Sequence, residues 1–318
     1  MCLLALLGGA GCGKEEAIDI SRAFPVVIRV PADVDVTQRT PGDPGTASPL
    51  QIPRHLYFFI SYIADGNTQP LVSAVSISDL SADSWAAVPD AYGAVQAYQR
   101  TVILPMPATD EVTLYAIASY DAITDLQTLV DRVRVGTTTI DEAGVNQLQL
   151  TPTQSDGSTV SLSDVYAGSG TLLTDEDAPN GTIVCYHVAA KFDVIYNLSD
   201  DFRSGGPYED WRVATFTLEN LVGKGYYFDP AANDFVLAEA LPPYTFTAGG
   251  GNNFYGRFDT YIFQPTATEF PWSVTLTNGT EQRILSGSSS VVNLSTEFAA
   301  YFRMNLTING IGDGTGND

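Results

Sequence analysis

The first residues of the chain place glycines and a lysine at a spacing that could hold a phosphate group. Gly8–Lys14 (GGAGCGK) matches the pattern GxxxxGK, in which backbone N–H groups cradle phosphates. That pattern requires serine or threonine after the lysine as a magnesium ligand. Here the next residue is Glu15, whose carboxylate would repel a nucleotide. Pro25 follows soon afterwards, so no long helix begins at this loop. The sequence therefore does not favour nucleotide binding.

Cys12 is better placed for covalent attachment of lipid. It follows an apolar run, Met1–Gly11 (MCLLALLGGAG), that ends in small residues, as a secretory signal peptide does at its cleavage site. Ala10-Gly11-Cys12 resembles the lipobox of bacterial lipoproteins, in which the cysteine is diacylated and becomes the first residue. Gly9, where leucine or valine is usual, and the missing basic segment depart from that pattern. We expect residues 1–11 to be a lipoprotein signal peptide and Cys12 to carry the lipid.

The residues after Cys12 indicate where such a lipoprotein would go. Gly13–Glu16 (GKEE) places a basic residue and then acids directly after the cysteine. This arrangement resembles the signal that sends lipoproteins of Bacteroidetes to the outer face of the outer membrane. We therefore expect the chain to reach the cell surface as an outer-membrane lipoprotein precursor.

Side chains for catalysis or metal binding are scarce. The chain has two histidines and three cysteines, and it contains no Gly-x-Ser-x-Gly, His-Glu-x-x-His or Cys-x-x-Cys pattern. Cys185 lies in an apolar run and is expected to be a small buried hydrophobe. His187 has no second candidate ligand nearby, so we expect it to be an ordinary strand residue. We predict no catalytic residue, no metal site and no cofactor.

Acidic side chains are the exception to this scarcity. Asp175–Asp177 (DED) could ligate calcium, but the segment lacks the regular spacing of a calcium loop and is better interpreted as a solvated linker. With 37 Asp and Glu in the chain, a glycosidase pair of carboxylates stays an alternative. The 15 Lys and Arg leave a net charge of -22, which repels phosphate backbones and anionic lipid headgroups. Nucleic acid is therefore not an expected partner.

The elements that position the side chains described above are predicted to be short β-strands. The 318 residues suffice for two domains, and the 16% of charged residues lies below the ~25% of typical soluble domains, as in a β-rich exported protein. Apolar runs between turn signals predict strands over 24–30, 55–63, 102–106, 112–119, 183–196, 213–221, 226–228, 245–247, 257–263, 272–276, 282–285 and 299–308. We expect 102–106 and 112–119 to pair with each other.

A helix is predicted over 123–135, because apolar residues recur there at helical spacing, namely Leu126, Leu129, Val130 and Val133. Residues 168–181 are polar and turn-rich and are predicted to be a linker between domains.

This order of segments resembles the Bacteroidales fimbrillin superfamily, whose members are the stalk, anchor and tip subunits of type V pili. The resemblance spans nearly the whole chain. It is carried by the loop Arg39–Gly45 (RTPGDPG) leading to His55–Ile60 (HLYFFI), by Val188–Tyr196 and by Thr215–Pro230 (TFTLENLVGKGYYFDP).

The resemblance implies an all-β fold of two tandem transthyretin-like β-sandwich domains with one or two short helices. The implied division is a signal peptide over 1–11, an N-terminal tether with a removable strand over 12–39, an N-terminal sandwich over 40–178 and a C-terminal sandwich over 179–318. It also implies a non-enzymatic lipoprotein that polymerises after an arginine-specific protease removes its first strand. Its partners would be other fimbrial subunits, the outer membrane before assembly, and a ligand on a host or bacterial surface.

In this chain the removable strand would be residues 24–30, with the apolar side chains Phe24, Val26, Val27, Ile28 and Val30. Arg39 and Thr40 would flank the cleaved bond, because Arg39 lies after this strand in a loop that a protease can reach. A sheet that loses a strand exposes unpaired N–H and C=O groups and an apolar groove. A neighbouring subunit's extended segment can fill both.

Several roles stay open. Residues 24–30 remain in the sheet if the chain is an uncleaved anchor subunit. Gly310–Asp318 (GIGDGTGND) has almost no apolar side chain to donate to a neighbour, which favours a subunit at or near the tip. Two other classes are a surface hydrolase and a surface glycan-binding lipoprotein. The candidate aromatic platforms of the latter are Trp85, Trp211, Trp272 and Tyr226–Phe228.

Overall fold

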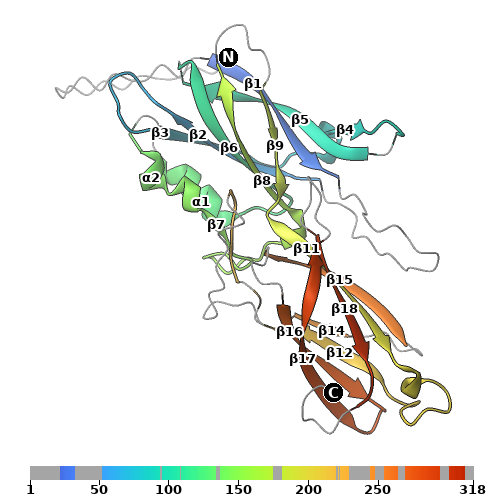
Figure 1. Cartoon of the computed structure of the whole chain (residues 1–318). Coiled ribbons are helices and arrows are strands. Elements are labelled where there is room, and N and C mark those ends of the chain that lie inside the picture. Colours follow the sequence, from blue (N-terminus) through green and yellow to red (C-terminus); the bar gives the residue numbers. More distant parts are fainter. Residues whose placement is uncertain are drawn as a thin grey trace.

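The computed structural model describes residues 22–32, 52–93, 95–107, 109–133, 137–174, 181–219, 221, 223–228, 244–247, 254–263, 269–293 and 301–311. Among these residues, strands account for most of the regular structure, and the α-helices are two short ones (Figure 1). The prediction of an all-β fold is therefore confirmed. Within the same ranges, no helix has the length and apolar character needed to cross a membrane.

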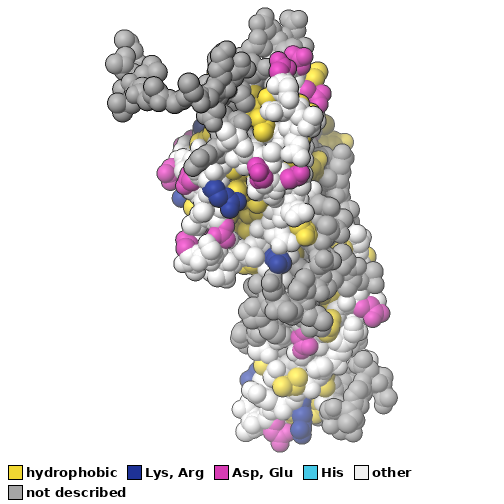
Figure 2. Space-filling model, turned by 90° about the vertical axis from the view of Figure 1, so that its left-hand side faces the viewer, with side chains coloured by type: hydrophobic (Ala, Val, Ile, Leu, Met, Phe, Trp, Pro, Cys, Tyr) yellow, Lys and Arg dark blue, Asp and Glu magenta, His cyan; other side chains and the backbone are white. Residues whose placement is uncertain are grey.

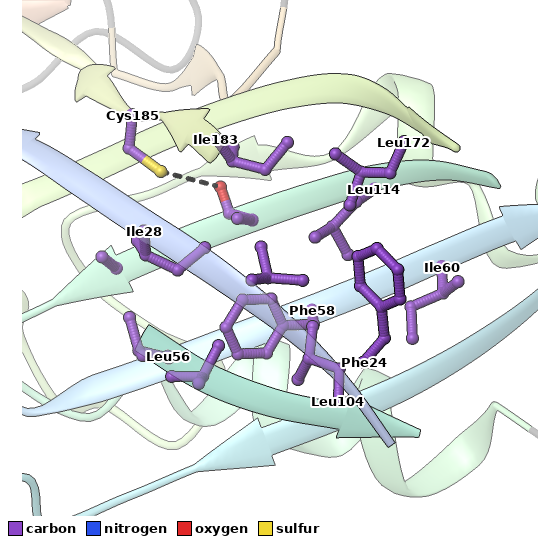
Figure 3. Close-up of a cluster of buried hydrophobic side chains, with 14 of the residues drawn as sticks. Phe24, Ile28, Leu56, Phe58, Ile60, Leu104, Leu114, Leu172, Ile183 and Cys185 are labelled. Carbon is purple, nitrogen blue, oxygen red and sulfur yellow. Dashed lines mark hydrogen bonds between the residues drawn. The ribbon is translucent and has the colours of Figure 1, made fainter. Parts of the chain in front are cut away.

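Two sheets built from the first part of the chain face each other. The first sheet has the strand order β4-β5-β1-β9, with β1 (Arg22–Pro31), β4 (Ala86–Pro89), β5 (Val95–Met106) and β9 (Gly181–Val184). The second has the order β10-β8-β6-β2-β3, with β2 (His55–Tyr62), β3 (Leu71–Ile77), β6 (Glu111–Ser119), β8 (Val165–Leu173) and β10 (Tyr186–His187). Their inward side chains form one apolar core, part of which is drawn in Figure 3.

The expected pairing of 102–106 with 112–119 was wrong. β5 pairs with β1 and β4, whereas β6 pairs with β2 and β8 in the opposite sheet. The chain crosses between the sheets after Met106, so Leu104 and Leu114 meet in the core from opposite sides. Alternating apolar residues identify the buried face of each strand, but they do not identify its neighbour.

Helices cover the outer face of the second sheet. α1 (Thr124–Arg132) and α2 (Ile140–Ala143) pack there, and Leu126 and Leu129 of α1 are buried, which confirms the predicted helix. The hydroxyl of Tyr57 in β2 accepts a hydrogen bond from the backbone N–H of Ile123 at 2.8 Å and so fixes the start of α1. Short 3-10 turns lie at η1 (Ala82–Ser84), η2 (Val145–Gln147), η3 (Leu162–Asp164) and η4 (Asp200–Phe202).

The rest of the chain forms a seven-stranded sheet that bends around its own core. Its order is β14-β12-β16-β17-β18-β11-β15, with β11 (Ala189–Leu198), β12 (Arg212–Leu218), β14 (Tyr244–Thr247), β15 (Tyr255–Phe263), β16 (Glu269–Thr277), β17 (Gln282–Asn293) and β18 (Tyr301–Ile308). β17 pairs first with β16 and then, over its last three residues, with β18. Phe192, Phe216 and Trp272 are among the core side chains.

A buried ionic cluster fixes the parallel pairing of β11 with β18. Asp193 is fully buried and accepts hydrogen bonds from the Tyr301 hydroxyl at 2.7 Å and from Arg303 Nε at 2.9 Å. Asp193 and Arg303 are register partners, so a shift of one residue would separate the carboxylate from its donors.

The predicted single strand over 183–196 is three strands in three sheets. β9 pairs with β1, β10 pairs with β8, and β11 joins the seven-stranded sheet. The chain therefore changes sheet at Cys185 and again at Val188. The division of the chain into domains after residue 178 stays a prediction. The two parts of the chain also touch, because β7 (Gln149–Leu150) pairs with β13 (Gly225–Tyr226).

Glycines in β8 make the first of these crossings possible. The predicted linker over 168–181 begins inside β8, which corrects that expectation. A Cβ atom on Gly168 would lie 2.1 Å from the backbone oxygen of Val184, and one on Gly170 would lie 3.0 Å from the Ile183 side chain. Glycine is required at Gly168 because another segment of backbone passes directly over β8.

Candidate functional site

β1 contains the residues 24–30 that the sequence predicted to be removable. It lies inside the first sheet, antiparallel to β5 from Arg22 opposite Met106 to Pro31 opposite Ala97. Along its other edge, Val26–Arg29 pair in parallel with β9. The predicted strand is therefore present and paired on both sides, and whether it leaves the sheet stays a prediction.

The side chains of β1 alternate between the core and the outer face. Val26, Ile28 and Val30 have no exposed surface and Phe24 is 7% exposed, whereas Val27 is half-buried on the outer face. Figure 3 shows Phe24 and Ile28 among Phe58, Leu104 and Ile183. At ~1.5–3 kcal/mol for each fully buried apolar side chain, the four inward residues contribute about 6–12 kcal/mol. This is comparable to the roughly 5–15 kcal/mol stability of a whole domain, so β1 can leave only if another strand replaces it.

Loss of β1 would leave a slot with two unpaired edges. β5 would lose its pairing with β1 along the whole length of that strand. β9 lies at the end of the sheet and would lose its only sheet partner among the described strands. The apolar floor of the slot would be the second sheet, which contributes Leu56, Phe58 and Leu114 to the same core. An incoming strand must therefore supply backbone hydrogen bonds on both sides and apolar side chains at alternate positions.

β1 is the first of the described strands, so it is joined to the others only through the segment that follows it. β1 comes first, and residues 33–51 connect it with β2 in the opposite sheet. Arg39 and Thr40 lie in this connection and, like Cys12, fall outside the described residues. A cut between Arg39 and Thr40 would leave β1 held by sheet pairing and core packing alone.

Cys185 lies directly beside β1. Its backbone N–H donates to the carbonyl oxygen of Arg29 at 2.8 Å, and its Sγ lies 3.8 Å from the carbonyl oxygen of Ala116 (Figure 3). The residue is fully buried, and this burial raises the pKa of the thiol to about 12. The prediction that Cys185 is a small buried residue is confirmed, and its thiol lies next to β1.

One polar residue of this region was missed by the sequence analysis. Arg100 of β5 lies opposite Ile28, so it belongs to the inward series of Tyr98, Val102 and Leu104. A lone arginine in an alternating apolar series is the signal that could have identified it. Its neighbour Arg29, on the outer face, donates from Nη2 to Oε1 of Gln99 at 3.0 Å.

The aromatic residues considered as glycan platforms pack largely inside the protein. Trp85 is buried and donates from Nε1 to the carbonyl oxygen of Pro53 at 3.1 Å, and Trp272 is buried and donates to Ser289 Oγ at 2.9 Å. Tyr227 is buried as well, and Trp211 is half-buried against the core of the seven-stranded sheet. Core packing therefore accounts for these side chains.

Charged groups do not gather into a site on the surface that Figure 2 displays. Acidic and basic side chains are scattered there among uncharged ones, in keeping with the net charge of -22. Among the described residues, no group of three or more His, Cys, Asp or Glu side chains could hold a metal ion. Asp175–Asp177, the calcium candidate, lies outside those residues.

His187 is a buried titratable group where β10 approaches the seven-stranded sheet. Its ring centroid lies 4.4 Å from that of Tyr166 in β8, with the two rings tilted by 44°, and 5.7 Å from that of Tyr261 in β15. Burial, with a smaller contribution from the positive charge of Lys191, lowers the pKa of His187 from 6.5 to about 4. The imidazole is therefore neutral at pH 7.

The lowered pKa of His187 predicts that acid destabilises the folded chain. Between about pH 6.5 and pH 4 the unfolded chain binds a proton at His187 and the folded chain does not, so stability falls as the pH falls through this window. We expect a loss of up to about 3 kcal/mol at pH 4. Urea unfolding at pH 7 and pH 4 measures it, with His187→Phe as the comparison. An equal loss in the variant would show that carboxylates alone cause the acid sensitivity.

No protein-family model matches the chain, and no curated protein matches it. Solved structures do. A candidate cell adhesion protein from Bacteroides eggerthii aligns at 16% identity with a TM-score of 0.51, over 93% of this chain and 89% of that chain. Another, from Parabacteroides distasonis, aligns at 13% identity with a TM-score of 0.52, over 91% of this chain and 89% of that chain. The chain shares the fold of these Bacteroidales proteins. The resemblance predicted from the sequence is thereby confirmed at the level of the fold.

Proposed function

We propose that the chain is a non-enzymatic structural or adhesive subunit of a bacterial surface fimbria, assembled by replacement of β1. The observation that carries this proposal is the position of β1: it precedes all other described strands, and yet it is inserted between β5 and β9 with four side chains in the core. The description of two proteins of the same fold as candidate cell adhesion proteins supports a role at the cell surface.

In the proposed sequence of events, Cys12 is lipidated and the chain reaches the outer membrane with β1 in place. An arginine-specific protease then cuts between Arg39 and Thr40. The cut frees β1 to leave, and the extended segment of a neighbouring subunit enters the slot between β5 and β9. Because the slot is apolar and unpaired on both edges, it stays closed by β1 until the replacement arrives.

An uncleaved anchor subunit is a second candidate, and one observation favours it. With β1 in place the first sheet is complete and its core is closed, so the uncut chain is a stable protein by itself. In that role Cys12 would hold the chain in the outer membrane permanently. The placement at the tip stays a prediction.

Two arginine variants test the proposal in cells that assemble the fimbria. The wild-type chain recovered from fimbriae is expected to begin at Thr40. Arg39→Ala is expected to stay uncut, to begin at lipidated Cys12 and to be absent from fimbriae. Arg22→Ala, which removes an arginine at the start of β1, should behave as wild type. N-terminal sequencing of the purified fimbriae and membranes gives the answer.

The possible results separate the two candidates. A wild-type chain that begins at Cys12 and stays in the membrane at the base of fimbriae would support the anchor. Incorporation of Arg39→Ala along the fimbria at the wild-type level would contradict replacement of β1.

A further inference from the structure

Arg100 is the charged member of an otherwise uncharged row of side chains that β5 presents to β1. It lies opposite Ile28 in the antiparallel register, and residues in this relation project from the same face of the sheet. Val102, Leu104 and Met106 continue the row and are buried in the core, and Tyr98 packs against the same core. The guanidinium group therefore lies on the face that β1 covers with Ile28.

β1 does not satisfy this guanidinium group. Nε and Nη1 of Arg100 are buried, and within the described part of the chain neither has a hydrogen-bond partner. A buried donor without an acceptor is costly, and more so when it carries charge. Ile28 opposite Arg100 has no acceptor to offer. Arg29, on the outer face, donates from Nη2 to Gln99, and only its Nε is buried without a partner.

We infer that the slot of β1 is built for a strand that carries a carboxylate opposite Arg100, at the position that Ile28 occupies in β1. This inference rests on the proposed function. A carboxylate suits the site because its two oxygens match the two N–H directions of a guanidinium group and balance its charge. The other inward positions face Val102 and Leu104, so they select apolar side chains, as Val26 and Phe24 do.

The same arrangement makes the replacement of β1 by such a strand energetically favourable. β1 closes the slot but leaves Nε and Nη1 of Arg100 without an acceptor, whereas a strand with the acid gains a charge-assisted hydrogen bond. A gain of this kind makes the incoming strand roughly ten- to a hundredfold tighter than β1. Arg100 is thus a residue that selects the partner strand, and β1 is a plug that the partner can outcompete.

A double-mutant cycle in the full-length uncut chain tests the preference of Arg100. Val26→Glu is the matched control for Ile28→Glu, because Val26 is equally buried on the same face but lies opposite Val102. We expect Ile28→Glu to lower the unfolding midpoint less than Val26→Glu. Arg100→Met should make Ile28→Glu markedly worse and change the effect of Val26→Glu much less, because Arg100 is only the diagonal neighbour of position 26. Arg100→Met alone should raise the midpoint, because it removes buried donors that have no partner.

Two outcomes of this cycle would contradict the inference. Equal costs of Ile28→Glu with and without Arg100, or a lower midpoint for Arg100→Met alone, would show that Arg100 does not seek an acceptor at this position. If Ile28→Glu does not fold in the Arg100→Met background, Ile28→Gln takes its place in the cycle.

Peptide competition extends the test to replacement. The chain is cut between Arg39 and Thr40 and mixed with a labelled peptide of residues 22–31, either unchanged or carrying Ile28→Glu. We expect the Ile28→Glu peptide to displace β1 at roughly tenfold lower concentration, and this preference to vanish in Arg100→Met. Equal uptake of both peptides would overturn the role of Arg100 and leave replacement intact. If neither peptide enters, replacement itself fails, and the cycle in the uncut chain still decides what Arg100 prefers.

Discussion

Val26→Glu is expected to lower the free energy of unfolding by about 3–5 kcal/mol, the cost typical of an uncompensated buried charge. Val26 has no exposed surface, and its register partners are Val102 in β5 and Gly181 in β9. None of these residues offers a donor side chain to a carboxylate. The variant therefore either protonates its new acid or pushes β1 out of the sheet.

Val27→Glu is the matched control on the same strand. Val27 is half-buried on the outer face, between Thr101 of β5 and Thr182 of β9. We expect a loss below about 1 kcal/mol, because the new carboxylate stays in contact with water. Urea unfolding of both variants gives the two values. Similar losses at the two positions would mean that β1 does not seat Val26 in the core.

Much of this architecture could be predicted from local patterns. The apolar run over residues 24–30 identified a strand, although not which of its side chains face the core, and the spacing of Leu126 and Leu129 identified α1. These features depend on residues close together in the sequence, whose periodicity directly reflects burial. Cys185 was correctly interpreted as buried for the same reason.

The arrangement of strands could not be derived in this way. β5 and β6 are neighbours in the sequence but lie in opposite sheets, and residues 183–196 form parts of three sheets. Gly168 was taken for a sign of a linker because glycine is common in turns. Its actual role is to leave room for the backbone of Val184, a contact between segments that no local pattern reveals.

The candidate site, too, could be predicted from the sequence only in part. The removable strand could be proposed from its apolar pattern and the arginine after it. Arg100 gained meaning only when the register placed it opposite Ile28 and its donors were found buried without partners. A lone arginine in an apolar strand is ordinary in a sequence and becomes informative only beside its neighbours.

The state of Cys185 offers a direct measure of whether β1 occupies its place. In the uncut chain the thiol is fully buried, its pKa is about 12, and its backbone is bonded to Arg29 of β1. We expect its reaction with a maleimide to be slower than that of a free cysteine by orders of magnitude, because only the exposed thiolate reacts. When β1 leaves, this shield is lost.

The most direct test of β1 as a replaceable strand therefore follows this thiol in the full-length chain with Cys2→Ser and Cys12→Ser, which leave Cys185 as the sole cysteine of the original three. The chain is cut between Arg39 and Thr40 and incubated with or without excess labelled peptide of residues 22–31. We predict that cutting lets β1 open transiently, so that Cys185 reacts faster than in the uncut chain but far more slowly than a free cysteine. We also predict that the labelled peptide replaces β1 and that excess peptide slows the reaction of the thiol again. A cut chain that keeps its own β1, takes up no peptide and leaves Cys185 as unreactive as in the uncut chain would contradict strand replacement.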